Sequence, residues 1–369
     1  MAPGCGLSVW FAGFDPVRSI NYKPQTINGK PQTYIFAVHP TLSALPDLSI
    51  LIVNYRTPRL ILDCLASVYT HTSGITFEVL IVDNQSGDDS QAQILARYPD
   101  VRWFDMGYNA GFARANNLAI RHAAGRNVLL LNSDTLLIDN LLARCVRVLD
   151  DQPDVAAVGA HQLGADGSLR PNLYTTFGQM RRAFYILPAG ARSEAWLTKQ
   201  IPDPHFADPA QVEWLSGAFL MTRQSTIAKA GPLDESFFMY GEDVEWGYRL
   251  GKQGRMLLLP DARFIHLEYG SSDNSKHVVT HINRFKPQIQ VSQLLWIRKQ
   301  YGLGAYLVLM LHYVLLVPIV FGGKLLINLK NRQPLFSQLD NQKAYARQVG
   351  IFGRFFWRTV FNRPGLYKV

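Results

Sequence analysis

The chain has 369 residues, enough for two or three domains, and 48% of them are apolar, which excludes a disordered chain. Its three cysteines are odd in number and widely spaced, which excludes a disulfide framework and favours a reducing compartment. The formal net charge of +9 is unevenly spread: Lys276–Val369 holds 14 Lys and Arg against one acid, and the rest holds 23 against 27. Such a basic tail suits anionic lipid or nucleic acid.

Residues 1–47 are irregular apart from a strand-like 33–38, and no basic residue precedes the short apolar run 7–14. We therefore expect an N-terminal extension and no signal peptide. From Leu48, short runs of branched apolar residues alternate with segments of helical pattern that begin at Ser, Thr or Asp. The expected strands are 48–54, 77–83, 101–104, 127–132 and 155–159, and the expected helices are 58–71, 86 or 88 to 98, 112–124 and 139–151.

This alternation predicts an α/β fold: a mostly parallel, Rossmann-like sheet covered by helices on both faces. Right-handed crossovers bring the C-terminal ends of parallel strands to one edge, where ligands bind in open sheets. Residues 163–210 look irregular, which in a compact domain usually indicates function. Structure resumes at 214–222, with a helix over 241–251 and a strand over 256–259. We expect three parts: 1–47, a catalytic domain over 48–275 and a helical region over 276–369.

Polar side chains follow two of the expected strands. Asp83 and Asn84 end the second, and Asn132-Ser133-Asp134 ends the fourth. An acid there can accept from a base N–H or a ribose hydroxyl, and the Asn-Ser-Asp run can offer oxygens to a hard divalent cation beside a diphosphate. Either cluster could instead cap the helix that follows it. Together on one edge, they favour a ligand site.

Glycines interrupt the polar segment Gly107–Asn117 just before an expected helix. Glycine lets the backbone approach a ligand, and a helix N-terminus favours phosphate, although the segment matches no P-loop. Three acids stand in Gly241–Trp246 at another helix start, after the apolar Phe237–Tyr240. They either complement the helix dipole or supply a general base with a raised pKa. His266 is a structural histidine or a metal ligand.

Seven motifs in this order resemble glycosyltransferase family 2, the inverting enzymes of GT-A fold, and its rhamnosyltransferase-like members. They span about Leu48 to Ser272 and read Val53-Asn54-Tyr55, Val82-Asp83-Asn84, Asn109-Ala110-Gly111-Phe112-Ala113, Leu131-Asn132-Ser133-Asp134, Ser216-Gly217-Ala218-Phe219, Phe237-Phe238-Met239-Tyr240-Gly241-Glu242-Asp243 and His266-Leu267-Glu268-Tyr269-Gly270-Ser271. Each motif is weak alone, but the ordered set is specific.

The resemblance implies a role for each motif. Asp83 would hold the nucleotide base, and Asp243 would be the catalytic base with Glu242 beside it. Asp134 and His266 would ligate Mn²⁺ or Mg²⁺. The remaining donor-site residues would be Asn54, Asn84, Asn109, Gly111, Asn132, Gly217 and Ala218. Asn132 stands where the family's metal motif usually has its first Asp, which predicts weaker metal binding that leans on the diphosphate; related members share this form.

The implied activity is transfer of a sugar from a nucleotide-diphosphate donor to a glycan or polyprenyl-linked glycan in surface polysaccharide synthesis. Rhamnose is the first candidate sugar, and UDP-hexoses remain open. A silent nucleotide-sugar-binding protein would have lost Asp134 or Asp243, and both are present. A nucleotidyltransferase would show a Gly-rich signature after the first strand, where Asn54-Tyr55-Arg56-Thr57 has none. The tail lacks any nucleic-acid motif, so no nucleic-acid partner is expected.

Leu303–Gly323 contains no Asp, Glu, Lys or Arg over 21 residues, and basic residues flank it on both sides. Arginines then alternate with Phe and Trp between Phe352 and Arg363. A buried core helix and a spanning helix are both open, but we favour an interfacial or re-entrant insertion on anionic lipid. The expected location is the cytoplasmic face of the plasma (inner) membrane.

Overall fold

The structure, a computed structural model, describes residues 26–27, 30–31, 45–170, 175–188, 190–267, 280–283 and 285–369. Two compact units divide the chain, Met1–His39 and Pro40–Val369. In the first, β1 (Thr26–Ile27) and β2 (Lys30–Pro31) form a small antiparallel ladder. The expected strand 33–38 and the motif residues Glu268–Ser271 lie outside the described residues.

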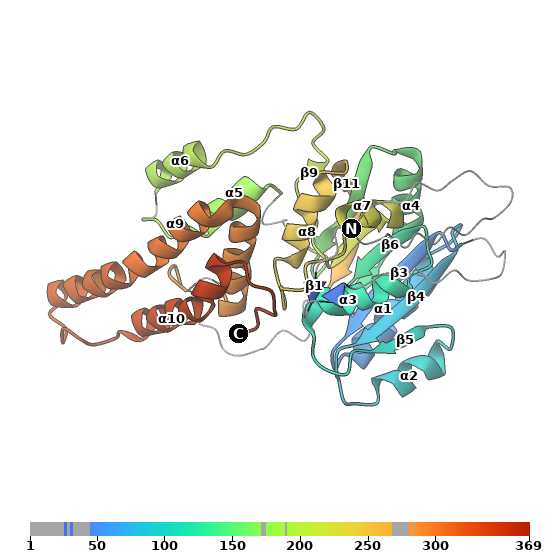
Figure 1. Ribbon diagram of the computed structural model, residues 1–369, viewed down its shortest axis with the longest axis horizontal. Helices are drawn as coiled ribbons and strands as arrows, with labels where there is room; N and C mark the ends of the chain where they lie inside the picture. The colour runs from blue at the N-terminus through green and yellow to red at the C-terminus, as the bar shows by residue number, and fades with distance from the viewer. Residues whose placement is uncertain are drawn as a thin grey trace, which may run out of the picture. The chain divides into compact units, whose positions relative to one another are not determined.

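One mixed sheet forms the centre of the second unit (Figure 1). Its strands are β3 (Leu48–Asn54), β4 (Phe77–Asp83), β5 (Arg102–Asp105), β6 (Asn127–Leu131), β7 (Thr135–Leu137), β8 (Val155–Leu163), β9 (Gln211–Val212), β10 (Phe219–Arg223) and β11 (Arg255–His266). They run in the order β5-β4-β3-β6-β10-β8-β11-β7, with β9 also paired to β11. The first four are parallel to one another, so Asp83 and Asn132 follow strands that end at one edge.

Strand β10 runs against both of its neighbours, β6 and β8. Phe219 pairs with Leu131 and Arg223 with Asn127, so β10 starts where β6 ends. The residues before β10, Gly217 and Ala218, therefore reach the same edge as Asn132. β11 lies parallel to β8, and the antiparallel β7 pairs Thr135 with His266. The expected α/β class is confirmed, although only the first half of the sheet is uniformly parallel.

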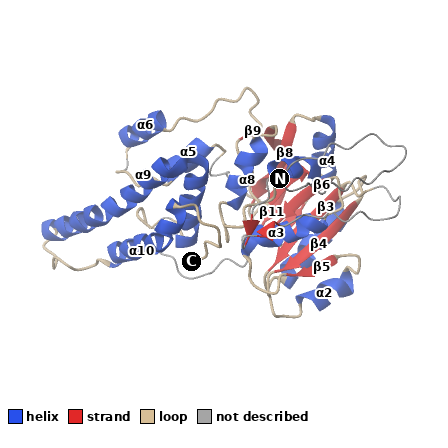
Figure 2. Ribbon diagram, in the orientation of Figure 1, coloured by secondary structure: helices blue, strands red, loops and turns tan. Residues whose placement is uncertain are grey.

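Alternate residues of the central strands point to opposite faces, and each face packs against helices (Figure 2). Leu48, Ile50 and Ile52 share one core cluster with residues of α1 (Pro58–His71), α2 (Ser90–Arg97) and α4 (Leu141–Asp151). Leu51 belongs to the other face, with residues of α3 (Gly111–His122), α7 (Gln224–Ala230) and α8 (Glu242–Gly251). Because both faces are buried, the strands read as continuous apolar runs.

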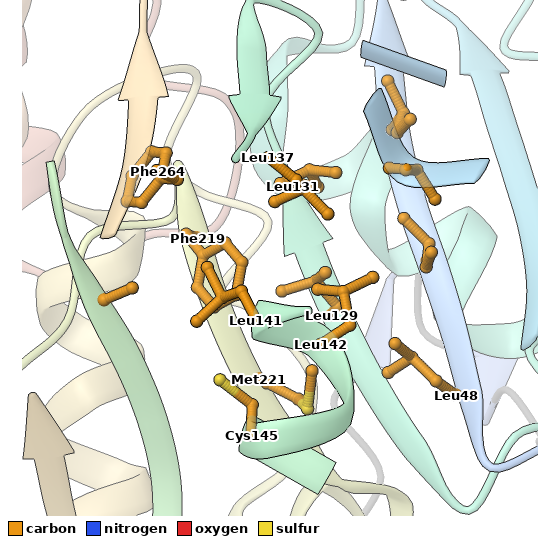
Figure 3. Packing of buried hydrophobic residues seen from close by; sticks show 14 of the residues in the cluster. Leu48, Leu129, Leu131, Leu137, Leu141, Leu142, Cys145, Phe219, Met221 and Phe264 are labelled. Carbon is orange, nitrogen blue, oxygen red and sulfur yellow. The ribbon is translucent and has the colours of Figure 1, made fainter. Parts of the chain in front are cut away.

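Aromatic packing joins β10 to β11 inside the first of these cores. The rings of Phe219 and Phe264 stack with their centroids 5.3 Å apart, next to Leu131 and Leu137 in Figure 3. Phe219 follows directly after Gly217-Ala218, and Phe264 stands two residues before His266. The stack therefore fixes both segments relative to the end of β6.

The expectation that 163–210 is irregular was wrong in part. It contains α5 (Phe177–Ala183) and α6 (Ala191–Gln200). Both helices are short, and prolines at 188 and 202 hide their periodicity. Thr176 starts α5 by accepting the Gln179 N–H, a true side-chain cap.

The basic tail forms two long helices, α9 (Pro287–Lys330) and α10 (Asp340–Val360). They pack lengthwise against each other, as Figure 1 shows. Gly302 breaks α9 with φ 86° and ψ −177°, so two helical segments meet there at a kink. The first segment packs on α8, and its buried residues share a core with α5, α10, Phe237 and Val244. The second segment leaves about half of its apolar side chains exposed.

Candidate active site

Asp83 lies at the end of β4, nearly buried, and its carboxylate is held from two sides. Oδ1 accepts from Asn54 Nδ2 at 2.8 Å and from the Ser86 hydroxyl, and Oδ2 accepts the Ser86 N–H at 2.9 Å. Asn54 is fully buried at the end of β3 and has no surface to offer a ligand. Its contribution is to orient Asp83, whose Oδ2 keeps a lone pair that can accept one further hydrogen bond.

Asn84 ties the next loop to the same edge. Its Oδ1 accepts the Ala110 N–H at 2.8 Å, and its Nδ2 donates to the Gly111 carbonyl at 3.2 Å. Asn109 in turn accepts the Gly111 N–H through Oδ1 at 3.3 Å. Gly111 has φ +81°, and a Cβ there would lie 2.1 Å from the carbonyl oxygen of Phe238. Only glycine allows the start of α3 to approach the segment before Asp243 this closely.

Asp134, Asn132 and His266 converge where β6, β7 and β11 meet. His266 Nε2 lies 3.1 Å from Asp134 Oδ1 and 3.4 Å from Asn132 Nδ2. The antiparallel pairing of β7 with β11 causes this convergence, since His266 pairs with Thr135 and the Leu267 N–H donates to the Asp134 carbonyl at 2.9 Å. A Thr57–Ser133 hydroxyl contact of 3.3 Å links this group to Asn54 and hence to Asp83.

The Asp134–His266 pair fits a divalent cation. Two ligands about 2.1 Å from one octahedral ion lie roughly 3.0 Å apart, close to the observed 3.1 Å. The amide of Asn132 can present its oxygen to the same point, because amide nitrogen and oxygen are interchangeable assignments. Among the described residues, no third His, Cys, Asp or Glu joins the pair. The protein alone therefore offers few ligands, and donor phosphates would have to complete the shell.

Asp243 stands in the first turn of α8 with both carboxylate oxygens hydrogen-bonded. Oδ2 accepts the Gly217 N–H at 3.0 Å, and Oδ1 accepts the Val244 N–H at 2.9 Å. Burial raises the pKa of Asp243, although these backbone N–H groups oppose the rise. Burial also raises the pKa of Glu242 well above its ordinary value, and the charge of Asp243 adds to that rise. The pKa of both carboxyl groups is therefore raised, and the rise is the larger for Glu242.

Hydrogen bonds and short stretches of backbone together link the three acids along the edge. Asp83 connects through Asn54 and Thr57 to Ser133, next to Asp134. The Asn132 N–H donates to the Ala218 carbonyl at 3.0 Å, and Gly217 donates to Asp243. The structure thus brings all the site residues expected from the sequence to one edge of the sheet.

Two further contributors were not recognised from the sequence. Ser86 or Asp88 was expected to cap a helix, but α2 begins after Asp89, and Ser86 instead supports Asp83. Phe112 donates its N–H to the Phe238 carbonyl at 2.8 Å and lines Gly217 with its ring. The Asp-Asn-x-Ser spacing was the available signal for Ser86, because it fits an Asx turn as well as a cap. Phe112 belongs to the third sequence motif, but the motif gives it no role, because that role depends on a loop more than a hundred residues away.

Residues 49–208 match the family model of glycosyl transferase family 2. Asp83 and Asp134 lie within this segment, and Asp243 lies beyond it. The match covers less than half of the chain; this segment is similar to that family, which confirms the resemblance found in the sequence motifs.

Several curated proteins are similar to the chain. An N-acetylglucosaminyl-diphospho-decaprenol L-rhamnosyltransferase of Mycobacterium tuberculosis is 29% identical over 55% of this chain and 71% of its own length. The low-salt glycan biosynthesis hexosyltransferase Agl10 of Haloferax volcanii is 29% identical over 57% of this chain and 63% of its own. The succinoglycan biosynthesis protein ExoO of Rhizobium meliloti is 30% identical over 63% of this chain and 64% of its own length. All three names belong to glycan biosynthesis.

Among solved structures, the chain is similar to the mannosyltransferase PcManGT from Pyrobaculum calidifontis in complex with GDP-Man and Mn²⁺. The superposition covers 89% of this chain and 91% of that one, at 15% identity and a TM-score of 0.45. A similarity of this size carries no argument about the site.

Replacing Gly111 with Ala should damage both the fold and donor binding, because the new methyl group meets the Phe238 carbonyl. Gly107→Ala is the matched control: its φ of +74° is equally left-handed, but no atom lies within 4 Å of the added Cβ. We expect the control to lose about 1–2 kcal/mol of unfolding free energy through backbone strain and Gly111→Ala to lose clearly more. Urea unfolding and nucleotide titration measure both effects. Equal losses in the two variants would contradict the close approach.

Proposed function

We propose that the chain is an inverting glycosyltransferase that moves a hexosyl or deoxyhexosyl group from a nucleotide-diphosphate donor to a glycan acceptor. The proposal rests on the edge of the sheet where Asp83, Asp134 and Asp243 lie one after another. Asp83 offers a hydrogen-bond acceptor for the nucleobase, Asp134 a cation site for the diphosphate, and Asp243 a carboxylate that can act as the general base. Rhamnose is the first candidate for the sugar, because the sequence motifs and one relative's name agree on it.

Asp243 acts as the general base in this proposal. The acceptor hydroxyl lies against its carboxylate, passes its proton to a free lone pair and attacks the anomeric carbon from the side opposite the nucleotide. The C–O bond to the leaving diphosphate breaks as the new C–O bond forms, so the anomeric configuration inverts. The Gly217 and Val244 N–H groups hold the carboxylate in one orientation, which keeps its free lone pairs directed at the acceptor.

Asp134 and His266 would hold Mn²⁺ or Mg²⁺, with Asn132 as a neutral ligand. Such an ion neutralises charge on the departing nucleoside diphosphate. The role of the protein side chains is to fix the diphosphate between the nucleobase site at Asp83 and the catalytic base Asp243. His266 Nδ1 is buried without a hydrogen-bond partner among the described residues, so its orientation rests on packing and on the Nε2 contacts.

The tail is proposed to keep the enzyme on a membrane that carries a polyprenyl-linked acceptor. By length and composition α9 could cross a bilayer, and only 22% of its most apolar window is buried. Exposed apolar residues lie along the second segment of α9, at a spacing of three or four positions between Leu303 and Ile319 with two doubled positions, and again near its end. They are Leu303, Leu307, Val308, Leu311, Val314, Leu315, Ile319, Leu326, Ile327 and Leu329.

The outward face of α10 favours a helix pair lying in the membrane surface over one that spans it. Lys343, Arg347 and Arg354 are exposed along this face, and Trp357 and Phe361 are exposed beyond them. Placing such charges at the bilayer centre costs about 2.5–3.5 kcal/mol each. With α9 in the acyl layer, the same residues meet anionic headgroups. The cytoplasmic leaflet, whose surface is negative, is the location we propose.

These assignments divide the chain by function. We propose that 48–275 carries catalysis, that 276–369 carries membrane attachment, and that 1–47 is an extension. The two functional parts share a core, since Phe237 and Val244 pack with residues of α9 and α10.

Asp243→Asn should leave donor binding nearly intact and lower turnover roughly 10²- to 10⁴-fold, the usual contribution of a general base. Release of nucleoside diphosphate from a panel of sugar donors, with and without acceptor, measures turnover. Asp105→Asn is the control, because this exposed acid ends β5 on the same edge. Wild-type turnover in Asp243→Asn would end the assignment.

The pH profile of kcat/KM should show the raised pKa of Asp243. Because the ionised carboxylate is the active form, activity should rise with pH through a pKa above the ordinary value of 3.8. Glu242→Gln should leave this acid limb in place, since the neutral acid and the amide carry the same charge. An acid limb at or below pH 3.8 would contradict the buried base.

Asp134→Ala should weaken metal-dependent binding of a nucleoside diphosphate by roughly tenfold or more. Calorimetric titration with Mn²⁺ and with a chelator separates the metal-dependent part. Asp139→Ala, an exposed acid nearby in the chain that pairs with Arg144, is the control. Unchanged affinity in Asp134→Ala would count against the cation site.

Charge reversal on α10 should release the protein from anionic vesicles. Each basic residue near such a surface contributes about 1 kcal/mol, so Arg347→Glu with Arg354→Glu should weaken flotation with phosphatidylglycerol vesicles by roughly thirtyfold or more. Leu311→Glu with Leu315→Glu should act similarly by removing inserted area. Arg97→Glu with Lys229→Glu, on α2 and α7, is the control pair. If the affinity for anionic vesicles were unchanged in both tail variants, the surface orientation would be refuted.

A further inference from the structure

The segment that precedes Asp243, Ser236–Gly241, has an unfavourable backbone. Tyr240 and Gly241 are both left-handed, with φ of 66° and 87°. A tyrosine at positive φ is strained and persists only where its surroundings hold it in place. These two residues turn the chain directly into α8, so their conformation sets the position of the Asp243 carboxylate. The contacts that hold this loop are therefore part of how the base is placed.

One side of the loop is held by the catalytic domain. The Phe238 carbonyl accepts the Phe112 N–H at 2.8 Å, and Gly111 lies against the same carbonyl. On the preceding turn, Asp234 forms an ion pair with Lys299 of α9 at 2.5 Å. Lys299 stands three residues before the kink of α9 at Gly302, so the helix pair already reaches the base of the loop.

The other side of the loop is held by two segments of the helix pair, which are the first turns of α9 and the residues that follow α10. The Tyr367 N–H donates to the Ser236 carbonyl at 2.8 Å, and Tyr367 forms a parallel bridge with Phe237. Lys368 Nζ lies 4.4 Å from the centre of the Phe238 ring. From α9, the Ser292 hydroxyl donates to the Met239 carbonyl at 2.9 Å. The segment after α10 and the first turns of α9 thus grip three successive loop residues and Ser236.

The first turns of α9 and the segment after α10 are also hydrogen-bonded to each other. Gln288 donates through Nε2 to the Tyr367 carbonyl at 2.9 Å and accepts the Val369 N–H through Oε1 at 2.9 Å. The Tyr367 ring is buried, stacks on Phe355 of α10 at 5.4 Å and lies under the Arg358 guanidinium at 4.8 Å. Arg358 donates to the carbonyls of Pro364 and Leu366. A displacement of α10 would therefore be transmitted to the loop through Tyr367.

We propose that Tyr367 and Gln288 are positioning residues for the catalytic base. They clamp Ser236–Gly241 between the helix pair and α3, and they hold the left-handed turn that presents Asp243 to the acceptor. The clamp makes the membrane-binding helices and the reaction centre one mechanical unit. Its catalytic consequence rests on the proposed function, whereas the clamp itself can be measured without turnover.

Three variants test the clamp. Tyr367→Ala removes the ring that fixes the segment after α10, and Tyr367→Phe keeps that ring. Gln288→Ala breaks three side-chain hydrogen bonds, to Ser292, Tyr367 and Val369, without opening the core. Tyr345→Ala is the matched control. Tyr345 is equally buried, between α9 and α10, and donates its hydroxyl hydrogen to the Tyr313 carbonyl at 3.1 Å. It has no contact with the loop among the described residues.

Hydrogen–deuterium exchange of the full chain gives the first readout. In Tyr367→Ala and Gln288→Ala, peptides covering 236–246 should exchange faster while those of β3 and β4 do not change. Tyr345→Ala should lower the melting temperature without this local effect. Unchanged exchange at 236–246 in both clamp variants, or the same increase in Tyr345→Ala, would overturn the proposal.

Turnover gives the second readout, below the melting temperature of every variant. We expect kcat to fall roughly tenfold to a hundredfold in Tyr367→Ala, because small displacements of a catalytic group are costly. Donor affinity should stay unchanged, and Tyr367→Phe should restore kcat. A uniform loss of donor affinity and kcat would indicate a merely structural role. An inactive wild type would instead sink the proposed function, and the exchange result would still decide the clamp.

Discussion

The direction of one strand decides where the chemistry can occur. β10 runs antiparallel between β6 and β8, so its beginning lies at the edge where the parallel strands end. This reversal brings Gly217 and Ala218 beside Asn132, and the Gly217 N–H then reaches the Asp243 carboxylate at 3.0 Å. A β10 parallel to its neighbours would put these residues at the far edge. The proposed donor residues and the proposed catalytic base are neighbours only because of this pairing.

Local pattern was sufficient for the first half of the fold. The bounds of β3, α1 and β4 agree with the expected 48–54, 58–71 and 77–83, because buried parallel strands are short apolar runs and Pro58 marks a helix start. The direction of β10 and the pairing of β7 with β11 depend on contacts distant in sequence, so no local pattern predicts them. The same limit hid Phe112, whose N–H bonds to the Phe238 carbonyl.

Candidate site residues could be named from the sequence because polar groups stand at strand ends, but their individual roles depend on partners. Asn54 was expected at the donor, and its full burial limits it to supporting Asp83 and the turn at Thr57. Asn132, a departure from an acid, faces His266 with a neutral amide. The apolar run and the basic charge of the tail can be read directly from the sequence. The pairing of α9 with α10 is visible only in the structure; it sets the exposed apolar side chains of α9 beside the exposed basic side chains of α10.

The position of a bound donor nucleotide tests the proposed site. The most direct measurement is an experimental structure of the full chain with a nucleoside diphosphate and Mn²⁺. It should place the nucleobase against Asp83, the Mn²⁺ at Asp134 and His266 with the diphosphate beside it, and the open end toward Asp243. A nucleotide bound elsewhere, for example in the hollow at the opposite edge lined by Arg223 and Lys229, with these three acids untouched, would contradict it.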